Sequence, residues 1–404
     1  MLARSWWMGF SLLLLLPPAV YSAGKETAAL SWKKTHVDKA FRSEGVAVAD
    51  VNHDGRMDIL TGDVWYEAPD WKVHEIRPPG HYGDGANGYS QSFLCFTRDV
   101  NNDGWPDLIV IGFPGQAAKW YENPQNKPGH WKEHLIWNSA CNETPQFADL
   151  FGDGKKVLIM GTQPEGQMCW FAPGQDPTQP WQPHPISDRS MGNQKVPGTD
   201  RFSHGLGVGD VNGDGRPDVI CTKGWWEQPP HAGDQPWRFH PANLGDDCAD
   251  MVVYDVNGDG RPDIISSSAH NYGMWWYEQQ PGKDGDPVFV RHVLFPHLFS
   301  ESHALICTDI NGDGLKDLVT GKRWWAHGPH GDVDPNAPAV LYWFEARKDK
   351  AGLTHFVPHP IDNDSGIGTQ FVVADMNGDK LPDVVISNKK GVFVFEQVRG
   401  ATNR

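Results

Sequence analysis

The chain is poor in basic residues and in cysteine, and both shortages exclude functions. Of its 404 residues, 35 are Lys or Arg and 51 are Asp or Glu, which gives a net charge of −16. An acidic chain lacks the basic face that nucleic acid phosphates require. It also has no Cys-x-x-Cys zinc pair, no phosphate-cradling Gly loop and no nucleophile-elbow Ser motif. The sequence gives no sign of these classes and no reason to expect a nucleic acid partner.

The six cysteines, at positions 95, 141, 169, 221, 248 and 307, are even in number but sparse. Several lie in apolar, strand-like runs, so buried thiols and disulfide bonds both remain open.

Long apolar runs are also missing, apart from one at the N-terminus. The run from Trp6 to Leu16 follows Arg4 and precedes the small residues Ser22 and Ala23. It is short for a membrane span but suits a signal peptide. We therefore expect a signal peptide over residues 1–23, one propeller domain over residues 24–404, a periplasmic or secreted location, and no membrane span.

The chain is rich in one nine-residue motif, D-x-N-x-D-G-x-x-D, which occurs seven times with variations. The copy at Asp149 is eroded, and the last copy has Lys380 in place of Gly. Repetition at roughly 45 to 65 residues indicates a repeat architecture. Positions 1, 3, 5 and 9 place oxygen ligands around a Gly turn, as in short calcium loops. The predicted calcium ligands are Asp50, Asn52, Asp54 and Asp58; Asp99, Asn101, Asp103 and Asp107; Asp210, Asn212, Asp214 and Asp218; Asp255, Asn257, Asp259 and Asp263; Asp309, Asn311, Asp313 and Asp317; and Asp375, Asn377, Asp379 and Asp383.

Each repeat contains four short apolar or aromatic runs, which predict four strands. One run enters the acidic loop, one leaves it, a third carries an aromatic pair, and a fourth ends near a His. Four strands repeated seven times predict an all-β, seven-bladed β-propeller. Because the His residues of the fourth runs recur in every blade, we expect them to be packing elements. They are His36, His74, His134, His184, His240, His292 and His359.

The last repeat ends after its third strand, near Gln397. A run at the start of the mature chain, Trp32 to Val37, is a candidate for the missing fourth strand. Pairing it with the last blade would close the ring and remove an exposed sheet edge.

The nine-residue motif resembles the FG-GAP/VCBS repeats of calcium-loop propellers. The resemblance covers about residues 30 to 398. It implies a propeller fold and calcium binding, but no particular activity. It also implies that first strands line a central channel and that the acidic loops share one face. Counting six residues back from each first Asp then gives the rim of the opposite face: Glu44, Phe93, Glu143, His204, Ala249, His303 and Thr369.

Loops that follow second strands add further side chains to that face, as do three insertions: 81–89, 188–201 and 327–338. Imidazoles and carboxylates that break the repetition favour a functional site over packing. The candidate catalytic residues are His204, His303, His270, Glu143, Glu44, Lys322 and Arg323. The candidate substrate-binding residues are Asp63, Lys223, Asp250, His327, Thr369 and Gln370.

Such a site suits acid–base chemistry on a sugar. His204 and His303, with Glu44 or Glu143, are also ligand types for a divalent transition metal. Several unrepeated stretches, among them His204 to Gly207, Ser302 to Leu305 and Gly321 to Gly328, are similar to the propeller domain of aldos-2-ulose dehydratase-like proteins. That resemblance implies a lyase or dehydratase acting on a keto-sugar or keto-glycoside.

Two other classes stay open. A non-catalytic propeller would bind carbohydrate or protein through the same face, and a purely structural secreted protein would hold calcium only. The rim would in the last case be a set of solvated polar groups around a water-filled channel.

Overall fold

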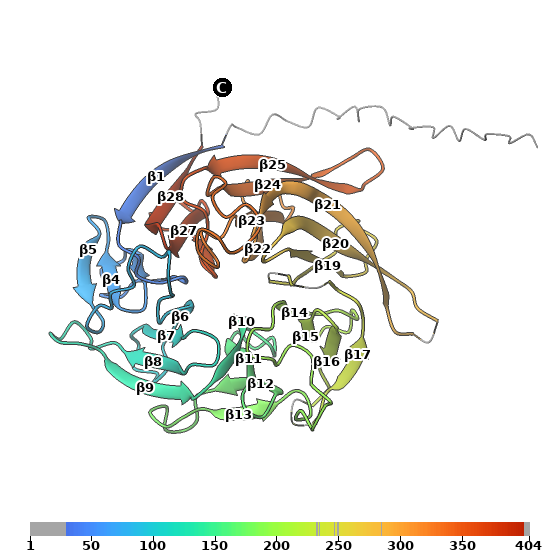
Figure 1. Cartoon of the computed structure of the whole chain (residues 1–404), viewed down its shortest axis with the longest axis horizontal. Coiled ribbons are helices and arrows are strands. Elements are labelled where there is room, and N and C mark those ends of the chain that lie inside the picture. The colour runs from blue at the N-terminus through green and yellow to red at the C-terminus, as the bar shows by residue number, and fades with distance from the viewer. Residues whose placement is uncertain are drawn as a thin grey trace, which may run out of the picture.

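The computed structural model describes residues 30–399, except residues 232, 234, 246, 249 and 284. All regular structure in this part is β: 28 strands form seven four-stranded antiparallel sheets. The sheets are arranged as the blades of a ring (Figure 1). The chain is therefore a seven-bladed β-propeller, as the repeat predicted. The described part contains no helix that could cross a membrane, and the predicted signal peptide lies outside the described residues.

Six blades are consecutive in the chain. Their strands are β2 (Ala47–Ala49), β3 (Asp58–Leu60), β4 (Val64–Glu67) and β5 (Lys72–Glu75); β6 (Leu94–Arg98), β7 (Asp107–Ile111), β8 (Ala118–Glu122) and β9 (Lys132–Trp137); β10 (Ala140–Ala148), β11 (Val157–Thr162), β12 (Gln167–Ala172) and β13 (Gln182–Pro185); β14 (Leu206–Gly209), β15 (Asp218–Cys221), β16 (Gly224–Glu227) and β17 (Arg238–Pro241); β18 (Val252–Tyr254), β19 (Asp263–Ser267), β20 (Tyr272–Gln280) and β21 (Val288–Ser300); and β22 (Leu305–Thr308), β23 (Asp317–Gly321), β24 (Leu341–Lys348) and β25 (Thr354–Asp362).

The seventh blade is built from both ends of the described chain. It contains β26 (Phe371–Ala374), β27 (Asp383–Asn388) and β28 (Gly391–Arg399), and β1 (Leu30–Asp38) is its outermost strand. β1 pairs antiparallel with β28, with Trp32 opposite Gln397. Figure 1 shows the two strands side by side. The run Trp32 to Val37 thus lies in the place that the sequence analysis gave it.

Apolar residues of neighbouring blades pack together into the core. In one cluster, Leu60 and Trp65 of the first consecutive blade meet Cys95, Leu108 and Tyr121 of the next, and all five are buried. First strands line the central channel, a cavity of about 560 Å³. All six cysteines are free thiols, and five of them are buried. Of the two alternatives for the cysteines, the structure shows thiols.

The repeated His residues are packing elements, as expected. In each blade the His of the outer strand stacks on an aromatic ring of the third strand; the Trp120 and His134 rings, for example, are 4.3 Å apart. In five blades the His also contacts a Glu at the end of the third strand or close to it, such as Glu122 for His134. These contacts join the outer two strands.

Candidate functional site

The two faces of the ring differ because the strands of each blade are antiparallel. In the blade of β14, Gly209 pairs with Asp218 next to the acidic loop, and Leu206 pairs with Cys221 at the far end. Residues that precede a first strand and residues that follow a second strand therefore share one face, opposite the acidic loops. The site described below lies on that face.

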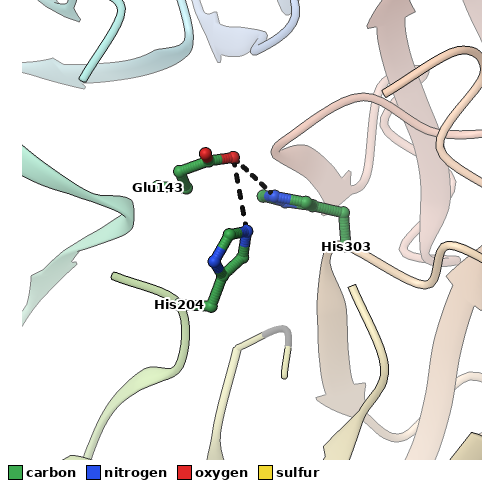
Figure 2. A group of neighbouring side chains, drawn as sticks. All are labelled: Glu143, His204 and His303. Carbon is green, nitrogen blue, oxygen red and sulfur yellow. Dashed lines mark hydrogen bonds and ion pairs between the residues drawn. The ribbon is translucent and has the colours of Figure 1, made fainter. Parts of the chain in front are cut away.

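Glu143, His204 and His303 come together from three blades (Figure 2). Oε2 of Glu143 lies 3.1 Å from Nε2 of His303 and 3.5 Å from Nε2 of His204. His303 is fully buried, and the side chains of Glu143 and His204 are each 7% exposed. Three polar side chains in one buried cluster are costly to maintain unless they are paired or bind a ligand.

Local irregularities place these side chains. Glu143 lies where β10 leaves regular pairing with β11, since the register shifts between Cys141 and Gln146. His204 precedes Gly205, which has φ of 74°, and a Cβ at Gly205 would lie 2.3 Å from Sγ of Cys248. Only glycine fits this turn into β14 without strain.

The cluster is electrostatically asymmetric. Burial alone would raise the pKa of Glu143, but hydrogen bonds from His204 and His303 and the charge of Arg323 hold it well below its usual range. Burial and the charge of Arg323 lower the pKa of His303 to about 3. Nη1 of Arg323 lies 3.4 Å from Oε2 of Glu143. The site thus combines an ionised carboxylate, a neutral imidazole and a guanidinium.

A second group adjoins the first. Nε2 of His270 lies 2.7 Å from Nε2 of His204. Its other nitrogen, Nδ1, lies 3.2 Å from Oδ1 of Asp332, and Asp332 also contacts Nδ1 of His327 at 2.9 Å. The hydrogen bond with Asp332 raises the pKa of His327. Burial raises the pKa of Asp332, but its two His partners outweigh burial and lower it.

A cavity of about 400 Å³ opens above these groups, with aromatic side chains on part of its wall. Ring centroids are 5.0 Å apart for Tyr89 and Phe113, 5.2 Å for Phe93 and Phe113, and 5.7 Å for Phe113 and Phe202. The guanidinium of Arg323 lies over the ring of Phe93 at 5.5 Å. The polar lining consists of Glu143, His204, Asp247, His270, Arg323 and His327.

Sequence analysis found most of this lining. Glu143, His204, His270, Arg323 and His327 line the cavity, and His303 supports Glu143 from below. Two other candidates are buried nearby in pairs of their own. Lys322, fully buried, pairs with Glu301 and donates to Oγ of Ser300 at 2.8 Å.

Glu44 is the second of these buried candidates. It accepts hydrogen bonds from the backbone N–H of Ser90, at 3.2 to 3.3 Å, and from the Ser90 hydroxyl. Burial raises the pKa of Glu44. Neither Glu44 nor Lys322 lines the cavity.

The remaining candidates occupy other places. Asp63 binds Arg77 at 2.7 Å, and the carboxylate of Asp250 faces the central channel, 2.9 Å from Gln146. Thr369 donates to the carbonyl of Phe93, and Gln370 accepts from the N–H of Val46. Lys223 is exposed and is not part of the cavity lining. The rim position Ala249 lies outside the described residues.

Three residues of the site were missed from the sequence: Phe202, Asp247 and Asp332. Each lies in an irregular segment outside the repeated strands, so counting from the acidic loops does not reach it. The insertion 327–338 was expected on this face, but nothing in its sequence singles out Asp332.

The acidic loops are held by their own side chains. In the loop at Asp99, the first carboxylate accepts the N–H groups of Asp103 and Gly104 at 3.0 and 2.9 Å. Asp107 is buried and accepts the N–H groups of Val100 and Asn123. Among the described residues, two groups bring three His, Cys, Asp or Glu ligand atoms within 4.8 Å of one another. These are Glu143, His204 and His303, and His270, His327 and Asp332.

The geometry defines the class as a seven-bladed propeller with a polar, partly aromatic cavity on the face away from its acidic loops. The FG-GAP-like repeat model matches residues 99–160 and 255–320. The chain is therefore a propeller with FG-GAP-like repeats. A comparison with curated proteins gave no significant match. The narrower resemblance to aldos-2-ulose dehydratase-like proteins is not confirmed.

Solved structures are similar to this chain at low identity. A lectin of Agrocybe aegerita, described by its specific recognition of non-reducing terminal N-acetylglucosamine, is 15% identical over 92% of this chain and 86% of its own, with a TM-score of 0.44. BBS1N, in a complex with ARL6DN soaked with lead, is 12% identical over 92% of this chain and 98% of its own, with a TM-score of 0.48. At these values no ligand or partner carries over to this chain.

Proposed function

We propose that the protein is a carbohydrate-active carbon–oxygen lyase that acts on a keto-sugar or keto-glycoside in the cavity. The observation that carries the proposal is the meeting of Glu143, His204 and His303 from three blades beneath a partly aromatic wall. Repeated packing does not require this cluster, because the corresponding positions of other blades hold Phe93 and Thr369. A concave site that combines polar groups with several aromatic rings suits a hydroxylated ring.

The cavity wall supports a sugar as the ligand. Tyr89, Phe93, Phe113 and Phe202 supply apolar ring faces for the C–H face of a sugar, and Arg323 supplies hydrogen-bond donors for an oxygen. The volume of about 400 Å³ lies in the range of small-molecule sites.

The proposed reaction is an elimination. A base removes the proton from the carbon next to the carbonyl, an enolate forms, and the C–O bond one carbon further on breaks. The products are an unsaturated ketone and water or an alcohol, whose oxygen takes up the proton. His327 suits the proton transfers, because Asp332 holds its Nδ1 and leaves Nε2 available. Arg323 is placed to stabilise the enolate oxygen.

Glu143, His204 and His303 also fit a divalent transition metal as ligands. The separations of 3.1 and 3.5 Å from the carboxylate oxygen to the two nitrogens are close to the spacing of atoms that share an ion at about 2.0 to 2.2 Å. A metal held there would polarise the ketone. These three side chains fit a divalent transition metal, and their role would be to hold the ion beside the cavity.

Calcium in the acidic loops is a separate proposal. The loop oxygens at positions 1, 3 and 5 are of the type that calcium prefers. In three loops an Arg at position 7 pairs with the Asp at position 5: Arg56, Arg216 and Arg261. The loops at Asp99 and Asp309 have no Arg at position 7 to compete with calcium for the Asp at position 5. They are therefore the strongest candidates for calcium sites. An exported protein would meet enough calcium to fill them, and export is likewise proposed from the N-terminal sequence.

The deciding experiment uses deuterium exchange and product formation. Purified protein is incubated in D₂O with a panel of keto-glucosides and with the matching unoxidised glucosides as controls. We expect exchange at the carbon next to the carbonyl and formation of the unsaturated ketone, both lost in His327→Ala. The alternative, a carbohydrate- or protein-binding propeller without catalysis, predicts binding by calorimetry with neither exchange nor product.

A further inference from the structure

His270 places a fourth donor atom beside the buried cluster. Its Nε2 lies 2.7 Å from Nε2 of His204, and His204 in turn lies 3.5 Å from the carboxylate of Glu143. His303 lies 3.1 Å from the same carboxylate oxygen. Four blades thus contribute one donor atom each, since His270 follows β19 while the others precede or interrupt β10, β14 and β22.

The nitrogen-to-nitrogen contact is informative. A contact of 2.7 Å between the two Nε2 atoms holds one proton between the rings. If His204 carries that proton, its N–H is divided between His270 and Glu143; if His270 carries it, Nε2 of His204 has no proton for Glu143. Atoms that share one ion at about 2.0 to 2.2 Å lie roughly 3 to 3.5 Å apart. The separations of 3.1 and 3.5 Å lie in this range, and the 2.7 Å between His204 and His270 is shorter. His270 lies outside the group of three donors that are within 4.8 Å of one another, so its ring would have to turn toward Glu143 and His303 to complete a set of four ligands.

The opposite nitrogen of His270 points to a second role. Nδ1 lies 3.2 Å from Oδ1 of Asp332. The ring is not aligned for a full hydrogen bond in this structure, and a small rotation of the imidazole would complete one. A metal-bound His usually gives its other N–H to a carboxylate, which fixes the tautomer that ligates.

We propose that His270 is the fourth ligand of a transition-metal site with Glu143, His204 and His303, and that Asp332 is the positioning residue that orients it. This rests on the metal-assisted form of the proposed function. Three imidazoles and one carboxylate favour a transition metal over Ca²⁺ or Mg²⁺. A five- or six-coordinate ion would keep one or two positions for substrate oxygen.

Asp332 makes the insertion 327–338 part of the site. The same carboxylate contacts Nδ1 of His327 at 2.9 Å, so one residue orients an imidazole of the metal cluster and the imidazole proposed for proton transfer. The loop is fastened separately by Asp334, which accepts a hydrogen bond from the hydroxyl of Tyr272. Asp334 therefore offers a matched control in the same loop.

The test measures metal binding without turnover. Protein freed of metal is titrated with Zn²⁺ and with Co²⁺, and affinity is followed by calorimetry and by the visible Co²⁺ absorption. We expect one ion per chain in the wild type, a 10- to 100-fold weaker affinity in Asp332→Asn, and a larger loss with a changed Co²⁺ spectrum in His270→Ala. Asp334→Asn should bind like the wild type.

Each other outcome has a defined meaning. If Glu143→Gln weakens binding but His270→Ala and Asp332→Asn stay within twofold of the wild type, a metal site exists without His270 and the inference is overturned. If the wild type binds neither ion, the inference is also overturned, while deuterium exchange still tests the lyase by itself. Circular dichroism of each variant identifies a loss that comes from misfolding.

Discussion

Oε2 of Glu143 lies 3.1 Å from Nε2 of His303, although 160 residues separate them. β10 and β22 belong to blades that are not neighbours, so the contact spans the ring. Arg323 joins the same carboxylate at 3.4 Å. Glu143 is therefore the residue on which two imidazoles and a guanidinium converge.

Replacing Glu143 should greatly reduce catalysis and have a smaller effect on folding. Glu143→Gln keeps the shape but leaves Arg323 and the imidazoles without a negative partner. We expect at least a 100-fold loss of deuterium exchange and product formation, since a positioned acid–base or electrostatic group contributes about 10²- to 10⁴-fold. Glu122→Gln is the control, because Glu122 supports His134 in an outer blade contact. Wild-type exchange in Glu143→Gln would remove the carboxylate from the mechanism.

The repeat made much of the site predictable. Because each blade repeats one register, six residues back from a first Asp gave Glu143, His204 and His303, which are brought together across the ring. His270 and Arg323 followed from the loops after second strands. The fold was predictable for the same reason, since one strand pattern recurs seven times.

Other parts of the site could not be read from the sequence. Asp332 and Phe202 lie in irregular segments, where no period fixes the direction of a side chain. Lys322 and Arg323 are adjacent, yet Lys322 turns into a buried pair with Glu301 while Arg323 reaches the cavity. Neighbouring residues of an extended segment point to opposite sides, so position alone gave Lys322 the wrong environment.

Lys322 should matter for stability rather than for chemistry. Lys322 and Glu301 are both fully buried as a pair. Lys322→Met leaves Glu301 without its cation, and removing one partner of a buried pair costs about 3 to 5 kcal/mol. Urea unfolding should show this loss, and the double variant Lys322→Met/Glu301→Leu should recover part of it. If Lys322→Met were as stable as the wild type but inactive, Lys322 would have a catalytic role instead.

Calcium removal should destabilise the propeller through its complete loops. At free calcium about 100 times the dissociation constant, a site that binds only the folded state contributes about 2.7 kcal/mol. We expect EGTA to lower the melting temperature and calcium to restore it. Asp103→Ala should reduce this calcium-dependent shift, whereas Asp153→Ala, in the eroded loop, should not. Equal melting temperatures in EGTA and in calcium would remove calcium from the loops.

Asp250 should make stability depend on pH. Its carboxylate faces the channel, and burial raises its pKa to about 7. In the unfolded chain the pKa is near 3.8. Between these values the folded state holds more protons than the unfolded state, so the free energy of unfolding falls as pH rises from about 4 to about 7.

Asp250→Asn removes this slope and can keep the hydrogen bonds of residue 250, although a flipped Gln146 amide loses its hydrogen bond to the carbonyl of Thr144. The Asn carbonyl can accept the N–H of Leu305, and its amide can donate to Gln146 after a flip of the Gln side chain. We expect the variant to gain about 1 to 3 kcal/mol relative to the wild type between pH 4 and pH 8, after allowance for screening by solvent in the channel. Urea unfolding of both proteins at several pH values measures the difference. The buried carboxylates of the acidic loops titrate in both proteins and cancel, so a difference that does not change with pH would show that Asp250 stays ionised in the fold.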